Sequence, residues 1–134
     1  MSKIDLIDTT LRDGNQSNWG ATGLDTGMML QIAPVMERIG FHAVDFLAST
    51  HMGVAVRFKK ENPWERLRLM REAMPSTSLQ FLTTGMRFIS WEVASEELME
   101  FAFRLLVNNG IDRFAIMDHM NNVTAMLNMA DITR

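Results

Sequence analysis

Short apolar runs alternate with segments of helical periodicity along most of the chain. The runs predict strands at 4–8, 43–46, 79–82 and 113–117, each followed by a segment whose apolar residues recur at helical spacing. This order is typical of an α/β protein in which parallel strands are joined by helical crossovers. The spacing fits either an open doubly wound sheet or a parallel (βα)4 half of a TIM (β/α)8 barrel, and periodicity alone does not choose between them.

The predicted helices are bounded by capping and breaking residues. A helix is predicted over 26–39, although Pro34 inside it should cost about 3 kcal/mol or force a bend. The segment 48–53 is expected to form a loop, with helical structure resuming over 54–60. The later helices are predicted to run from Pro63 to Met74, from the cap Ser95 to Asn109-Gly110, and from the end of 118–122 to Arg134.

Composition excludes several classes of protein. With 47% hydrophobic and 22% charged residues, the chain resembles ordinary soluble domains, and neither disorder nor a membrane span is indicated. A formal net charge of -3 argues against nucleic-acid binding. Arg66, Arg68 and Arg71 form a basic cluster, but Glu65 and Glu72 interleave with it. We therefore expect this cluster to be a solvated helix face.

Cysteine, methionine and the N-terminus add smaller points. The chain has no cysteine, which excludes disulfides, thiolate catalysis and cysteine-ligated zinc. The opening MSKIDLIDTT lacks the long apolar stretch of a signal peptide, so a cytoplasmic location is the default expectation. The thirteen methionines are expected mainly in the core, because methionine fills irregular gaps there.

The most informative segment is DTTLRDGNQS at 8–17, which directly follows the first predicted strand. Catalytic groups of α/β barrels lie at the carboxyl ends of the strands. Asp13 has the hard oxygen ligands that divalent cations bind, Arg12 suits a carboxylate or enolate oxygen, and Gln16 can donate to a carbonyl. The same residues also fit a plain turn with a surface Arg-Asp pair, so their spacing leaves both interpretations open.

DTTLRDGNQS resembles the signature of the carboxyltransferase domains found in pyruvate carboxylase, oxaloacetate decarboxylase and transcarboxylase, and more distantly that of the lyases and synthases that use acyl-CoA. Further along the chain, Ile32-Ala33-Pro34, the segment VAVRF at 54–58 and the segment PWERL at 63–67 are similar to other segments of that family. The similarity covers nearly the whole chain and corresponds to the N-terminal half of a TIM barrel. It favours the biotin-dependent branch over the acyl-CoA branch.

The resemblance implies roles for three residues. Asp13 matches the family's metal-ligating aspartate, and Arg12 and Gln16 match residues that line the pocket for a 2-oxo acid or its enolate. The implied cofactors are a divalent metal, namely Zn, Mn, Co or Mg, and carboxybiotin carried by a partner domain or subunit. The implied partners are biotin carrier and biotin carboxylase components. A homo-oligomer is expected on a separate ground, because a four-stranded half-barrel leaves two unpaired edges.

Three positions depart from the family pattern. The arginine that usually grips the substrate carboxylate falls at Thr84, the tyrosine after it falls at Trp91, and a pocket aspartate falls at Gly53. A different or larger acyl substrate is therefore expected. Arg87 could supply the lost charge or be an exposed loop residue.

The histidines and one further aspartate complete the candidates. His51, Asp118 and His119 are expected in loops after the second and fourth strands, where they contact substrate or serve as polar loop residues. His42, just before the second strand, is expected at the opposite end with a structural role.

Three functions remain open at this point. The first is a carboxyltransferase or decarboxylase that works with carboxybiotin, and the second is a lyase or condensing enzyme that acts on an acyl thioester. The third is a non-catalytic half-barrel that associates with itself or a partner. The family's other metal ligands, a carbamylated lysine and a His-x-His pair, belong to later strands, so the 134 residues alone are expected to be inactive.

Overall fold

The computed structural model describes residues 4–88 and 92–134, which contain one four-stranded sheet. The strands lie in the order β1-β2-β3-β4, and every neighbouring pair is parallel. Their bounds are β1 Ile7–Asp8, β2 Ala43–Ala48, β3 Ser78–Thr84 and β4 Arg113–Met117. The predicted α/β order of four parallel strands with helical crossovers is confirmed. Because all strands run the same way, their carboxyl ends meet at one edge of the sheet.

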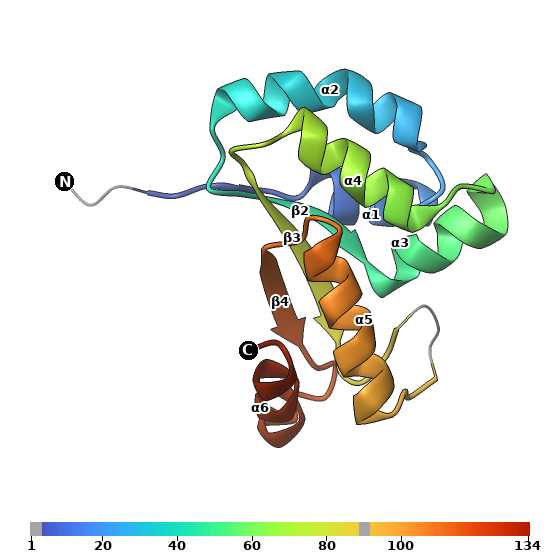
Figure 1. The fold of residues 1–134 in the computed structure, drawn as a ribbon, viewed down its shortest axis with the longest axis vertical. Helices are drawn as coiled ribbons and strands as arrows, with labels where there is room; N and C mark the ends of the chain where they lie inside the picture. The colour runs from blue at the N-terminus through green and yellow to red at the C-terminus, as the bar shows by residue number, and fades with distance from the viewer. Residues whose placement is uncertain (1–3, 89–91) are drawn as a thin grey trace.

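Helices connect the strands. They are α1 Asn15–Trp19, α2 Thr26–Ile39, α3 Ser49–Val54, α4 Pro63–Ala73, α5 Glu96–Asn108 and α6 Val123–Ile132, with two π-helical turns, η1 Thr10–Gly14 and η2 Ala55–Lys59. Figure 1 shows α2 and α4 side by side, with α5 running along β4 and α6 at the C-terminal end of the chain. In the part of the chain that the structure describes, no helix is both long and apolar enough to pass through a membrane.

The helices cover one face of the sheet. Alternate residues of β3 and β4, namely Leu79, Phe81, Phe114 and Ile116, belong to or pack against the hydrophobic core. The side chains of a strand alternate between its two faces, so the intervening residues point to the other face. The methionines fill much of this core, as expected: Met29, Met36, Met52, Met70, Met74, Met99 and Met129 are all buried.

The helix starts predicted at Pro63 and after Ser95 are confirmed. Ser95 accepts a hydrogen bond from the backbone N–H of Leu98, and Asn62 accepts one from that of Trp64 just before Pro63 starts α4. The α2 helix runs through Pro34 without interruption and ends at Gly40, whose φ of 73° is in the left-handed region that glycine adopts without strain.

Some predicted element bounds were wrong. The first strand was predicted over 4–8, but only Ile7–Asp8 pairs with β2. The apolar residues before it, Ile4 and Leu6, are exposed and bury little surface that would hold them in the sheet. The predicted loop at 48–53 is wrong as well, since α3 begins directly after β2. Its residues are nearly all buried, and tertiary packing stabilises a short helix there that local propensity does not reveal.

A β-bulge interrupts the register between β2 and β3. Asp45 pairs with Gln80, whereas the next paired residue of β2, Leu47, faces Phe81. Two residues of β2 therefore span one step of β3. Bulges of this kind re-aim side chains and are common beside active sites.

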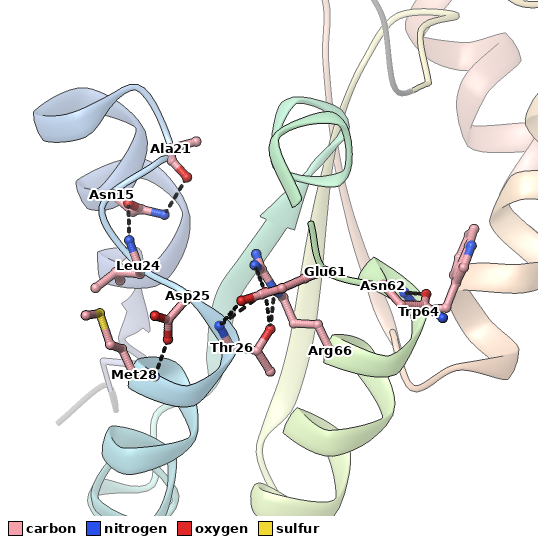
Figure 2. A network of polar contacts seen from close by, with 10 residues as sticks. All are labelled: Asn15, Ala21, Leu24, Asp25, Thr26, Met28, Glu61, Asn62, Trp64 and Arg66. Atoms are coloured by element: carbon pink, nitrogen blue, oxygen red, sulfur yellow. Dashed lines mark hydrogen bonds and ion pairs between the residues drawn. The ribbon is translucent and has the colours of Figure 1, made fainter. Parts of the chain in front are cut away.

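The expectation of a solvated basic face on α4 is wrong for Arg66. Figure 2 shows its guanidinium between α2 and the start of α4, where Nε donates to Thr26 Oγ1 at 2.9 Å and Nη2 lies 2.5 Å from Glu61 Oε2. The side chain is only 2% exposed. Arg71 likewise bonds backbone carbonyls, including that of Gly110, and only Arg68 of the three is exposed as expected.

Replacement of Arg66 by leucine is expected to lower the free energy of unfolding by about 2 kcal/mol, because Glu61 and Thr26 lose their partner in a partly buried site. Urea unfolding followed by circular dichroism measures the change. The matched control is Arg68→Leu on the same helix, which is expected to stay within about 0.5 kcal/mol of wild type. Equal effects of the two substitutions would contradict the structural role of Arg66.

Candidate functional site

The polar segment after β1 folds into η1 and α1 rather than into an open loop. Asp8 begins the turn by accepting hydrogen bonds from the backbone N–H and the hydroxyl of Thr10, both at 3.0 Å. Leu11 anchors η1 in the core, while Gly14 N–H donates to the carbonyl of Thr9 at 3.0 Å across the wide turn. π-helical turns occur frequently at functional sites. The turn places Arg12 and its neighbours at the carboxyl edge of the sheet.

Arg12 is held by a carboxylate on the neighbouring strand. Its Nε and Nη2 atoms both lie 2.6 Å from Asp45 Oδ2, and its Nη1 lies 2.9 Å from Asp13 Oδ1. The exposed fractions are 15% for Arg12, 2% for Asp45 and 54% for Asp13. Short charge-assisted hydrogen bonds of this kind fix the plane of a guanidinium. Arg12 is thus oriented by its neighbours while part of its side chain remains accessible.

Sequence reasoning missed Asp45. The available signal was an acidic residue inside the apolar run AVDFLA of β2, since a buried charge in a strand needs a partner. Its second oxygen, Oδ1, is buried and has no hydrogen-bond partner among the described residues. A buried carboxylate that is only half satisfied is unusual in a purely structural role.

His51 lies in α3 and is buried, so its expected place in a loop was wrong. Its Nε2 is 3.1 Å from the backbone carbonyl oxygen of Arg12, and its Nδ1 has no partner among the described residues. The pKa of the imidazole is lowered from 6.5 to about 4. Burial is the largest cause, and the charges of Arg12 and Arg66 act in the same direction, whereas the Arg12 carbonyl and Asp13 oppose the shift. The ring is therefore neutral near pH 7.

The candidate metal ligand stands alone. Asp13 is exposed, and its Oδ1 forms an ion pair with Arg12 Nη1. The described residues contain no group of three or more His, Cys, Asp or Glu residues that could hold a metal ion. A divalent cation needs several convergent protein ligands. These residues therefore do not complete a metal site by themselves. Gln16 follows the buried Asn15 in α1 and is partly buried, four positions after Arg12.

The side chain of Asn15 stabilises, through hydrogen bonds, the segment that carries Arg12, Asp13 and Gln16. Figure 2 shows its side chain, whose Nδ2 donates to the Ala21 carbonyl and whose Oδ1 accepts from the backbone N–H of Leu24. The same oxygen accepts from the N–H of Gly23. The loop between α1 and α2 is thereby closed onto the start of α1.

A second group of candidates lies at the ends of β3 and β4. Thr84 is the last residue of β3, and the next residue, Gly85 with a φ of 59°, approaches both neighbouring loops. A Cβ atom at Gly85 would lie 3.6 Å from both Arg87 Nη1 and Asp118 Oδ1. Hydrogen bonds from the backbone N–H groups of Asn122 and Met120 lower the pKa of Asp118, and Arg87 contributes in the same direction. Arg87 and Asp118 are thus brought together.

The remaining candidates are placed as follows. The substituted position Gly53 is buried within α3 and carries no charge, while Trp91 lies outside the described residues. His42 lies at the amino end of β2, where its Nε2 is 2.6 Å from Arg113 Nη1, so its predicted place away from the site is confirmed. His119 is exposed after β4.

A hollow of about 810 Å³ between α5, β4 and α6 is lined by none of the candidate site residues.

No family model matches the sequence, but individual relatives do. The chain is 36% identical over 120 residues to the 2-oxoglutarate carboxylase large subunit of Hydrogenobacter thermophilus, a match that covers 90% of this chain and 18% of that protein. It is 33% identical over 123 residues to a pyruvate carboxylase subunit of Methanocaldococcus jannaschii, covering 92% of this chain and 22% of the relative.

Solved structures extend the similarity to the fold. The carboxyl transferase domain of Rhizobium etli pyruvate carboxylase with oxamate and biotin superposes with a TM-score of 0.89 at 30% identity, over 98% of this chain and 22% of that one. The same domain with 3-hydroxypyruvate gives a TM-score of 0.90 at 31% identity, with the same coverage. The chain thus spans about a fifth of the length of these relatives. Its four parallel strands and their helices match part of a carboxyltransferase TIM barrel. The chain corresponds to the N-terminal part of that domain and belongs to the carboxyltransferase domain family of biotin-dependent enzymes.

Proposed function

We propose that this chain supplies the first part of the active site of a biotin-dependent carboxyltransferase that acts on a 2-oxo acid or a related acyl compound. The observation that carries the proposal is the placement of Arg12, whose guanidinium is held by Asp45 at the carboxyl edge of the parallel sheet. An arginine used only for surface charge does not require a buried carboxylate to orient it.

Arg12 would bind the substrate. A planar guanidinium matches the two oxygens of a carboxylate, and its charge stabilises the negative charge that develops on an enolate oxygen. Because Asp45 and Asp13 already fix the plane of the guanidinium, little reorganisation is needed when the substrate arrives. Gln16 would donate to the substrate carbonyl from the adjacent helix α1.

The carboxyl group would come from carboxybiotin on a carrier domain or subunit that a biotin carboxylase component charges. Relatives of known structure support this assignment, since one solved carboxyl transferase domain contains pyruvate and biocytin. Thr84 offers no charge at the end of β3, and Arg87 beside Asp118 would take over part of the contact with a larger acyl substrate.

The test measures decarboxylation of 2-oxo acid carboxylation products by the purified full-length protein in the presence of free biocytin. Oxaloacetate and oxalosuccinate are compared, since they report on pyruvate and 2-oxoglutarate as carboxyl acceptors. A rate that depends on biocytin supports the proposal. The second candidate, a lyase or condensing enzyme, predicts cleavage of an acyl-CoA thioester without biocytin, and that result would replace the proposal.

Asp13→Ala in the full-length protein is expected to abolish metal-dependent turnover with little loss of fold, because an exposed carboxylate contributes charge to the site and little to the core. Metal content, the rate with biocytin and circular dichroism are measured on the same preparation. A fully active Asp13 variant would remove this residue from the metal site.

The 134-residue chain alone is expected to bind manganese or zinc with a Kd weaker than micromolar. Titration calorimetry measures this affinity.

The 134-residue chain by itself is expected to self-associate. Among the described residues β1 and β4 each pair on one side only, and Met28, Ile32, Val35 and Ile39 form a half-exposed apolar stripe along α2. Light scattering measures the mass in solution. Ile32→Glu is expected to shift it toward the monomer, whereas the control Gln31→Glu on the same helix leaves it unchanged. A monomeric wild-type chain would contradict the expectation.

A further inference from the structure

The backbone of Arg12 is held by a different residue from the one that holds its side chain. His51 Nε2 lies 3.1 Å from the Arg12 carbonyl oxygen. A carbonyl oxygen only accepts hydrogen bonds, so the imidazole must donate from Nε2, and Nδ1 then carries a lone pair. The same carbonyl also accepts from the backbone N–H of Asn15, where η1 passes into α1.

His51 is buried and uncharged near neutral pH. The ring is 1% exposed, and its pKa of about 4 leaves it neutral near pH 7. The charged groups around it are Arg12, Arg66 and Asp13, of which the two arginines disfavour the imidazolium. The hydrogen bond to the Arg12 carbonyl is therefore one between neutral groups.

Two anchors on one segment thus fix Arg12. Asp45 in β2 holds the guanidinium, and His51 in α3, which follows β2 directly, holds the main chain. The peptide unit whose oxygen His51 binds joins Arg12 to Asp13. A displacement of this unit would therefore move both the guanidinium and the Asp13 carboxylate.

The histidine is a poor choice for stability alone. Its buried Nδ1 has no partner among the described residues, and a buried polar atom left unpaired costs about 1–3 kcal/mol. A side chain selected only to fill this space would avoid that cost. Costs of this kind concentrate at functional sites, where placement of a group outweighs stability.

We propose that His51 is a positioning residue, whose Nε2–H sets where Arg12 and Asp13 stand at the carboxyl edge of the sheet by holding the Arg12 carbonyl. Its effect on substrate binding rests on the proposed function of Arg12. Its effect on the geometry of the turn does not.

The experiment compares three replacements of His51 in the full-length protein. Glutamine can place a donor where Nε2 stands, asparagine can place one only near Nδ1, and leucine places none. Titration calorimetry measures the affinity for oxamate, an unreactive analogue of pyruvate. NMR records the Arg12 Nε–H resonance, assigned by its loss in Arg12→Lys. Thermal unfolding of each variant identifies effects of stability alone.

His51→Gln is expected to keep the wild-type Arg12 Nε–H resonance and oxamate affinity. His51→Asn and His51→Leu are expected to shift the resonance and to weaken oxamate binding about tenfold or more, since small displacements of a binding group are costly. Glutamine and asparagine variants that melt alike yet differ in this way support the proposal.

Two results would contradict these expectations, one for the role of His51 and one for the proposed function. If the Gln and Asn variants show the same Arg12 resonance, the Nε2 donor does not position the turn and the proposal is overturned. If the wild-type protein itself does not bind oxamate, the proposed function fails, while the resonances of the two variants still decide the role of His51.

Discussion

Arg12→Ala in the full-length protein is expected to lower the biocytin-dependent decarboxylation of the preferred substrate at least ~100-fold, with the fold retained. The substitution removes the guanidinium that would stabilise the enolate charge, and it leaves the carboxylates of Asp45 and Asp13 without their shared cation. Initial rates at several substrate concentrations separate kcat from KM. A loss in both is expected, because Arg12 would contact the substrate before and during the reaction.

Two further variants sharpen this prediction. Arg38→Ala on the exposed surface of α2 serves as the matched control and should keep wild-type rates. Asp45→Asn preserves the shape of the anchor but removes its charge, so an intermediate loss of rate is expected. Wild-type kcat/KM in Arg12→Ala would refute the assignment of Arg12 as a substrate-binding residue.

Stability is expected to fall between pH 6.5 and pH 4 by about 3 kcal/mol because of His51 alone. Its pKa is about 4 in the folded protein and 6.5 in the unfolded chain, so the unfolded state binds the proton first as the pH falls. The stabilising contribution is fully present above pH 6.5, decreases through this window, and is lost below about pH 4.

Urea unfolding at a series of pH values measures this slope. The window from pH 6.5 down to pH 5 is the most informative, because the lowered pKa values of Glu37 and Glu61 place their effects at lower pH. His51→Gln should abolish most of the slope, whereas the exposed control His119→Gln should keep it. A wild-type curve that is flat across this window would mean that His51 is protonated in the folded protein without cost.

The topology could be predicted because it depends on patterns that repeat. Apolar runs alternate with helical periodicity at regular intervals, and caps such as Ser95 and Gly40 mark the helix ends locally. Arg12, Asp13 and the end of β1 were found for the same reason, since their motif follows a strand directly. Whether they bind substrate and metal stays a prediction.

The partners of these residues could not be predicted from local pattern. Asp45 and His51 are more than thirty positions away from Arg12 in sequence, and only the parallel pairing of β1 with β2 brings them together. Arg66 looked like a surface charge because its neighbours in sequence are charged, but it bonds Thr26, forty positions away, together with Glu61 just before α4. Tertiary pairing of polar groups leaves little trace in periodicity.

The bulge in β2 separates a residue of the candidate site from the core residue that follows it. An extra residue between Asp45 and Leu47 lets the strand switch faces, so that Asp45 serves the site while Leu47 meets Phe81 on the helix-covered side. A replacement of Asp45 on one face of β2 therefore need not alter the packing of Leu47 on the other. Deletion of Phe46 would remove the bulge and make β2 a regular strand. Asp45 and Leu47 would then be adjacent and would point to opposite faces only through the normal alternation of a strand, so the site and the core would no longer be separated by an extra residue.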